Sequence, residues 1–188
     1  MPRPSTRHAQ KPCRTSYSGA STMTDQTRQF CGLLRGTWIS RPNGKLTLIE
    51  DLRLGDAITT LDHGPMPIIR IDAEEHSATL TEATPDLWPW IYTPDQMDDD
   101  GLYLRGDQLI LWAPGGCTDT LISARDLARC HQHQCRRLDG WPASVTWYRL
   151  HLEGHQIIVA DGYPVGSARV DPEIALCRNL INEVSEWA

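Results

Sequence analysis

Three side chains that could do chemistry stand next to strand-like segments of this 188-residue chain. Cys31 lies just ahead of the first expected strand, and a cysteine becomes a nucleophile once its thiol has ionised. His155 ends a tight turn, and Asp161 stands directly before Gly162. Functional groups concentrate on the loops of rigid scaffolds, so each of the three is a candidate site residue. The alternatives are an ordinary thiol at the edge of a core, a half-exposed turn histidine, and an aspartate that bonds its own turn backbone.

A second group of reactive side chains is the segment Cys130-His131-Gln132-His133-Gln134-Cys135, which holds four possible zinc ligands. In an extended segment the first of these ligands faces away from the other three, so the four converge only if the chain turns. Structural zinc sites usually supply their ligands as two separated pairs. We therefore expect a solvated loop, with no metal and no other cofactor. A Cys130–Cys135 disulfide and a small metal-binding domain are the alternatives.

Short runs of strand-forming residues, separated by Gly, Pro, Asn and Asp, predict a mainly β domain. Asn43-Gly44 joins two such runs, Thr37–Ile39 and Leu46–Ile49, and Asn-Gly is the strongest short-range hairpin signal. The runs Ser144–Leu152 and Gln156–Ala160 predict a second hairpin, which Asp161-Gly162 ends. Further strands are expected at Ala57–Leu61, Ile68–Ile71, Leu102–Leu104, Leu109–Trp112 and Thr120–Ile122.

The remaining segments lack a strand pattern. Residues 74–100 carry three prolines and a run of acids without any sustained period, which predicts a long loop or insertion. Ser123–Ala128 could form one helical turn. The tail over 171–188 predicts a C-terminal helix, because Asp171 can cap it and Pro172 suits its first position.

Length and charge limit the functions open to the chain. A chain of 188 residues suggests one domain, and 18 basic against 24 acidic residues argue against a general nucleic-acid surface. Residues 1–24 hold four basic residues and no acid. Their Ser, Thr and Pro content without an apolar run predicts a disordered basic segment over 1–30. A β domain over 31–170 and the helix over 171–188 would follow it.

Neither a membrane span nor a secretory signal is visible. No apolar stretch approaches the roughly 20 residues that a span needs, so we expect no membrane partner. A cytoplasmic location is the default, although the Arg- and Ser-rich start also has the composition of a transit peptide, and Met23 is an alternative start. Six scattered cysteines do not form the disulfide framework of a small secreted domain, which favours reduced thiols.

Two groups of motifs frame residues 32–167. The first comprises Gly36-Thr37-Trp38-Ile39, Pro42-Asn43-Gly44, Ile49-Glu50-Asp51-Leu52-Arg53-Leu54-Gly55-Asp56 and Thr60-Leu61-Asp62-His63-Gly64. The second comprises Val145-Thr146-Trp147-Tyr148-Arg149-Leu150, His155 and Ala160-Asp161-Gly162. With these motifs the chain resembles the Hint domain, the fold shared by Hedgehog C-terminal domains and inteins, in its bacterial stand-alone form.

The resemblance implies a horseshoe-like, mainly β fold that cuts or rearranges its own backbone, so that the substrate is its own polypeptide. It makes Cys31 the nucleophile that attacks the carbonyl of the Phe30–Cys31 peptide bond and converts the amide to a thioester. A histidine must donate a proton to the departing nitrogen. The resemblance also makes His155, at the place of the family's closing histidine, and Asp161 site residues.

The chain departs from the family pattern at three places. Family members place the cysteine four residues before the glycine of Gly-Thr, a position that Gly32 holds here, so Cys31 would need a one-residue bulge to regain its placement. Gln108 stands where the family has its proton-donating histidine, and glutamine can donate a hydrogen bond but cannot titrate. Cys177-Arg178-Asn179 does not match the His-Asn that ends an intein, so full splicing is not expected.

The sequence therefore favours an autoprocessing domain with a degenerate active site, capable at most of slow cysteine-dependent self-cleavage. A non-enzymatic binding or structural module on the same fold is the alternative, and the sequence identifies no protein partner for it.

Overall fold

The structure is a computed structural model, and it describes residues 31–94, 101–113, 119–141 and 143–168. The basic segment predicted for 1–30 and the helix predicted for 171–188 lie outside these residues. Within them the elements are β1 (Leu33–Leu34), β2 (Trp38–Ser40), η1 (Pro42–Gly44), β3 (Leu46–Leu48), η2 (Ile49–Asp51), β4 (Ala57–Thr60), β5 (Gly64–Pro67), β6 (Arg70–His76), α1 (Ala78–Ala83), η3 (Pro85–Leu87), β7 (Trp90–Tyr92), β8 (Leu102–Leu104), β9 (Leu109–Trp112), β10 (Thr120–Ser123), α2 (Ala124–Cys130), β11 (Cys135–Arg137), β12 (Val145–His151), β13 (Ile157–Ala160) and β14 (Tyr163–Gly166). None of the helices in these ranges has the length and apolar character that a transmembrane span requires.

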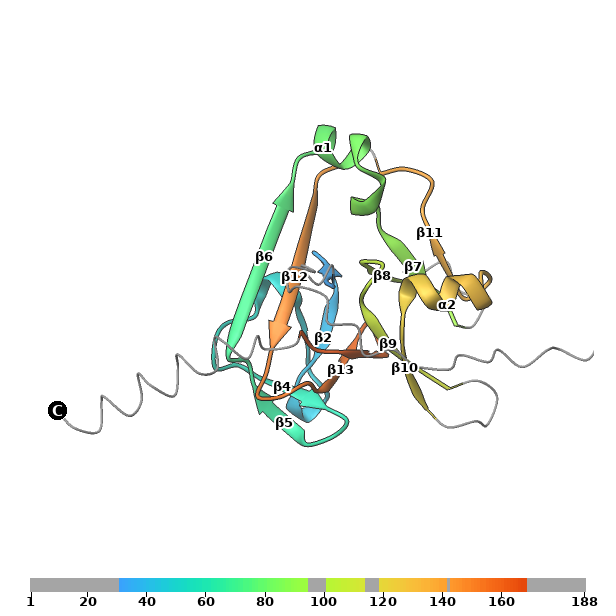
Figure 1. Cartoon of the computed structure of the whole chain (residues 1–188). Coiled ribbons are helices and arrows are strands. Elements are labelled where there is room, and N and C mark those ends of the chain that lie inside the picture. The colour runs from blue at the N-terminus through green and yellow to red at the C-terminus, as the bar shows by residue number, and fades with distance from the viewer. Residues whose placement is uncertain (1–30, 95–100, 114–118, 142, 169–188) are drawn as a thin grey trace, which may run out of the picture.

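The strands form two antiparallel sheets. The first has the order β11-β7-β8-β1-β12-β6, and the second has the order β10-β9-β14-β13-β2-β3, with β4 joined to β13 and β5 to β4. The longest pairing joins β6 and β12, which run side by side along one flank of the molecule with α1 at one end (Figure 1). β1 belongs to the first sheet and β2 to the second, so the chain passes from one sheet to the other within a few residues of Cys31.

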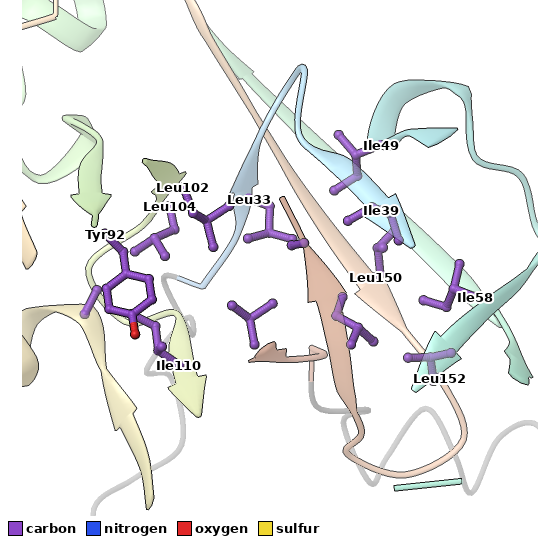
Figure 2. Packing of buried hydrophobic residues seen from close by; sticks show 14 of the residues in the cluster. Leu33, Ile39, Ile49, Ile58, Tyr92, Leu102, Leu104, Ile110, Leu150 and Leu152 are labelled. Carbon is purple, nitrogen blue, oxygen red and sulfur yellow. The ribbon is translucent and has the colours of Figure 1, made fainter. Parts of the chain in front are cut away.

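One hydrophobic core is shared by both sheets. Leu33 on β1 is buried, and Figure 2 shows Leu104 on one side of it and Ile39 and Leu150 on the other. Burying a side chain of this size contributes about 1.5–3 kcal/mol to stability. The core therefore fixes the backbone directly after Cys31.

The hairpin predicted at Asn43-Gly44 is confirmed. β2 and β3 pair across the turn, and both turn residues have positive φ, 74° at Asn43 and 70° at Gly44. Asparagine and glycine tolerate this conformation better than other residues. The helical turn predicted at Ser123–Ala128 is also confirmed as the start of α2, since the Ser123 hydroxyl accepts the N–H of Asp126 and caps the helix.

The predicted second hairpin is wrong. β12 pairs with β1 and β6 in the first sheet, whereas β13 pairs with β14, β2 and β4 in the second. Asp161-Gly162 is instead the two-residue turn between β13 and β14, with φ of 46° and 82°. Two apolar runs around a glycine look the same in sequence whether they pair with each other or cross between sheets.

The long loop predicted for residues 74–100 is also wrong over most of its length. β6 continues to His76 because it pairs with β12 at seven positions. α1 then starts at a cap in which the Ser77 hydroxyl accepts the N–H of Leu80. Pro85 takes the first position of η3, which leads into β7. Pro85 therefore begins a short element rather than excluding one.

Candidate functional site

Cys31 is half-buried, and only Gly32 separates it from β1. Gly32 donates its N–H to the Oε1 atom of Gln108 at 3.1 Å, and its carbonyl accepts the N–H of Arg105 at 2.9 Å. A Cβ atom at Gly32 would lie 3.3 Å from the Cβ of Trp147, and the φ of 156° is rare for residues with a side chain. The position at which the resemblance expects a cysteine is thus a confined glycine, and Cys31 stays one residue ahead of it.

Gln108 connects the Cys31 segment to the second sheet. Its side chain is buried, and its Nε2 atom donates to the carbonyls of Gly166 at 2.7 Å and Leu109 at 3.2 Å. The amide oxygen and both amide hydrogens are therefore engaged. The backbone carbonyl of Gln108 accepts the N–H of Ala124 at the start of α2, which fixes the turn between β8 and β9. Gln108 acts here as a hydrogen-bonded link between distant segments.

His155 lies at the other end of this link. A Cβ atom at Gly166 would lie 2.7 Å from the Nε2 atom of His155, so the half-buried imidazole rests against this glycine. Gly166 in turn accepts the hydrogen bond from Gln108. The structure therefore brings Cys31 and His155 to one region through Gly32, Gln108 and Gly166. We call these five residues the Cys31 site.

Asp161 makes its contacts elsewhere. Its Oδ1 atom accepts the N–H of Trp38 at 2.8 Å, and its own N–H donates to the Trp38 carbonyl at 2.8 Å. Burial raises the pKa of the Asp161 carboxyl, and the hydrogen bond from Trp38 opposes that rise. The carboxylate also lines an open pocket of about 620 Å³ together with Tyr103 and the β1–β2 link. The recorded contacts of Asp161 thus tie the β13–β14 turn to β2 rather than to the Cys31 site.

The electrostatic surroundings of Cys31 include residues that sequence reasoning did not single out. Burial raises the pKa of the Cys31 thiol, whereas the positive charges of Arg149 and Arg105 lower it. Asp107 adds a smaller effect that raises the pKa. Arg105 stands in the segment that departs from the family motif, which was the one sequence signal that could have drawn attention to it.

The segment 130–135 does not gather its possible ligands. Cys130 ends α2 and is exposed, whereas Cys135 begins β11 and is buried, and neither is in a disulfide. The His131 ring packs 4.6 Å from the Trp112 ring. Among the residues that the structure describes, no group of three or more His, Cys, Asp or Glu side chains is placed to hold a metal ion. The segment therefore divides between the end of α2 and the start of β11.

A search against protein-family models matches residues 31–172 to the Hint domain. The chain belongs to the Hint domain family. The match begins at Cys31 and contains every candidate site residue discussed above. A separate search of curated proteins finds no match to this Hint domain.

Inteins are among the solved structures that share this fold. The Hint domain is similar to a DnaB intein from Synechocystis sp. PCC 6803, with a TM-score of 0.51 and 11% identity over 73% of this chain and 99% of the other. It is also similar to the Ssp DnaB mini-intein variant M86, with a TM-score of 0.53 and 12% identity over 78% and 99% of the two chains. At such identities the likeness shows the fold alone, and it confirms the expected mainly β Hint fold.

Proposed function

We propose that this Hint domain is an autoprocessing domain with impaired catalysis, capable at most of slow self-cleavage at the Phe30–Cys31 bond and not of full splicing. One observation carries the proposal. The residue linked to the backbone after Cys31 is Gln108, whose amide is fully engaged in hydrogen bonds. A group of this kind can hold the backbone in place but cannot transfer a proton.

The step that the site would perform is an N-to-S acyl shift. The Cys31 sulfur attacks the carbonyl carbon of residue 30, the carbon–nitrogen bond breaks, and the nitrogen of Cys31 gains the proton that the thiol loses. The product is a thioester between residue 30 and the Cys31 side chain. Water or an added thiol then takes the acyl group and releases a fragment that begins at Cys31. The nitrogen departs only after it has been protonated, and this is the part of the reaction that needs a proton donor.

Two properties of the site slow this step. Burial raises the pKa of Cys31, so that a smaller fraction of the thiol is ionised at neutral pH. Gln108 supplies no proton, and general acid–base catalysis contributes about 10²–10⁴ in rate. His155 is a titratable candidate, but it rests against Gly166, on the far side of the Gln108 amide.

A second candidate function follows from the same hydrogen bonds. Gln108 joins the residue before β1, the β8–β9 turn and β14, which suits a fold retained for binding or as a structural module without catalysis. In that case Cys31 would be an ordinary half-buried thiol. The sequence and the structure name no partner for such a module.

Intact mass separates the two functions. Purified protein is incubated for several days with and without dithiothreitol, beside Cys31→Ala and, as a matched control, Cys130→Ser, whose thiol is exposed at the end of α2. We expect a slow, thiol-stimulated fragment that begins at Cys31, in wild type and Cys130→Ser but not in Cys31→Ala. An unchanged mass in all samples would contradict self-cleavage and leave the structural module. A fragment that persists in Cys31→Ala would exclude Cys31 as the nucleophile.

A further inference from the structure

The side chain of Arg105 lies against the backbone that follows Cys31. Only 2% of its surface is exposed, although arginine is among the residues least often buried. The backbone N–H of Arg105 donates to the Gly32 carbonyl at 2.9 Å, and the Cδ atom of its side chain lies 3.4 Å from where a Cβ of Gly32 would be. The backbone and the side chain of Arg105 thus both contact the residue next to the candidate nucleophile.

The long β6–β12 pair holds the guanidinium in place. Arg105 Nη1 lies 3.1 Å from Glu74 Oε2, and the guanidinium carbon lies 5.9 Å from the centre of the Trp147 ring. Glu74 on β6 is the register partner of Trp147 on β12, so one rung of the ladder supplies both the counter-charge and the aromatic face. A buried charge is costly unless it is paired, and Glu74 provides that pair.

Arg149 adds a second positive charge from β12, the strand that carries Trp147. It lies two residues beyond Trp147 on β12 and therefore on the same face of the sheet, where its Nε atom is 3.7 Å from Asp72 Oδ2. Both arginines lower the pKa of Cys31 against the effect of burial, while Asp107 raises it. Glu74 and Asp72 compensate the two arginines from β6.

We propose that the buried Arg105 guanidinium, fixed by Glu74 and Trp147, acts together with Arg149 to stabilise the negative charge of the Cys31 thiolate. Arginine stays protonated at all ordinary pH values, so Arg105 can stabilise a thiolate but cannot donate a proton. The two arginines would then offset part of the effect of burial on the nucleophile, while the site lacks the proton transfer that Gln108 cannot supply. The use of this thiolate in self-cleavage rests on the proposed function, whereas its stabilisation by Arg105 does not.

The pH dependence of Cys31 alkylation tests the proposal. The full chain is treated with iodoacetamide between about pH 6 and pH 10, and the alkylation rate of Cys31 is followed by peptide mass mapping, with the exposed Cys130 as internal reference. Arg105→Met is expected to slow alkylation of Cys31 about tenfold at pH 8 and to shift its profile by about one pH unit. Arg105→Lys, which keeps the charge, is expected to restore most of the rate.

A purely structural role for Arg105 would give different results. If Arg105→Met leaves the profile of Cys31 unchanged, or if Arg105→Lys is as slow as Arg105→Met, the proposal is wrong. Should Arg105→Met fail to fold, Arg149→Gln provides the second test, since this side chain is partly exposed and its loss should slow alkylation in the same direction. An unchanged rate in Arg149→Gln together with an unfolded Arg105→Met would also overturn the proposal.

The alkylation assay and the cleavage assay fail independently. Wild-type protein that never cleaves, yet shows the slower alkylation in Arg105→Met, contradicts the proposed function and supports the role of Arg105. Protein that cleaves at Cys31, but whose Arg105→Met variant shows no change in alkylation, supports the proposed function and contradicts the role of Arg105.

Discussion

Cys31 is a half-buried thiol and Cys135 a buried one, and the charges around them differ. Cys135 begins β11 within the hydrophobic core, and burial alone raises its pKa to about 12. Cys31 precedes β1 where the chain passes between the two sheets, and there Arg149 and Arg105 oppose the effect of burial. Burial thus raises the pKa of both thiols, but only at Cys31 do positive charges oppose that rise, which makes Cys31 the more reactive candidate.

The comparison also explains why spacing alone misleads. The segment 130–135 offers four metal-ligand side chains within six residues, and the fold separates its two cysteines between a helix end and a core strand. The residues of the Cys31 site are scattered between positions 31 and 166, and the two sheets bring them together. Proximity in this fold comes from strand pairing across the whole chain.

The largest expected effect is the difference in reactivity between the two cysteines. With a pKa of about 12, only about one Cys135 thiol in ten thousand is ionised at pH 8. We expect iodoacetamide to alkylate Cys31 at least about a hundredfold faster than Cys135 in the folded protein. Peptide mass mapping measures both rates in one sample, and denatured protein, in which both thiols should react alike, is the control. Equal rates in the folded state would remove the distinction between the two regions.

Gln108 in the Cys31 site and Gln132 near Cys135 can be compared by how much each contributes to stability. Gln108→Ala leaves the buried N–H of Gly32 and the carbonyl of Gly166 without their partner, and each unpaired buried group costs about 1–3 kcal/mol. We expect the free energy of unfolding to fall by about 2–4 kcal/mol, measured by urea denaturation. Gln132→Ala, on the exposed side of the 130–135 segment, is the matched control and should change stability by less than about 0.5 kcal/mol. Similar effects of the two variants would show that the Gln108 link is not structural.

Sequence reasoning succeeded where local chemistry decides the structure. Asn43-Gly44, the cap at Ser123 and the Hint motifs are short segments whose conformation depends on the residues themselves. It failed at the β12–β13 connection. β12 pairs with β1 and β6 in one sheet and β13 with β14 in the other, and these pairings depend on residues outside the two strands. For the same reason it placed Gln108 in a motif but could not see its bonds to Gly32 and Gly166, and it missed Arg105.

A smaller effect is expected from the contact between His155 and Gly166. Gly166→Ala places a methyl group against the imidazole, and overpacking of this kind costs about 1–3 kcal/mol. In a His155→Ala background the cost should fall by at least half, because the ring that collides has been removed. A double-mutant cycle from urea denaturation measures this coupling. If the cost is the same in both backgrounds, His155 does not contact Gly166 and the Cys31 site loses its histidine.

The smallest expected effect concerns Asp161, which lies outside the Cys31 site. Its pKa is raised in the folded state, so the protonated form is favoured on folding, and the stability from this group is present at low pH and lost as the pH rises through the folded pKa. Asp161→Asn keeps an acceptor for the Trp38 N–H and tolerates the positive φ, but it carries no charge. The variant should be slightly more stable than wild type at pH 7 and equal to it near pH 3. Thermal denaturation at the two pH values measures the difference, and a variant that is less stable at pH 7 would show that the carboxylate charge is needed.

The most direct test of the account is the cleavage rate of Gln108→His. If the missing proton donor limits self-cleavage, a histidine at this position should speed formation of the fragment that begins at Cys31 by about 10²-fold or more, as followed by intact mass. The double variant Gln108→His with Cys31→Ala should yield no fragment. A folded Gln108→His protein that cleaves no faster than wild type, or a wild type that cleaves within minutes, would contradict the central claim that Gln108 has replaced the catalytic proton donor of this Hint domain.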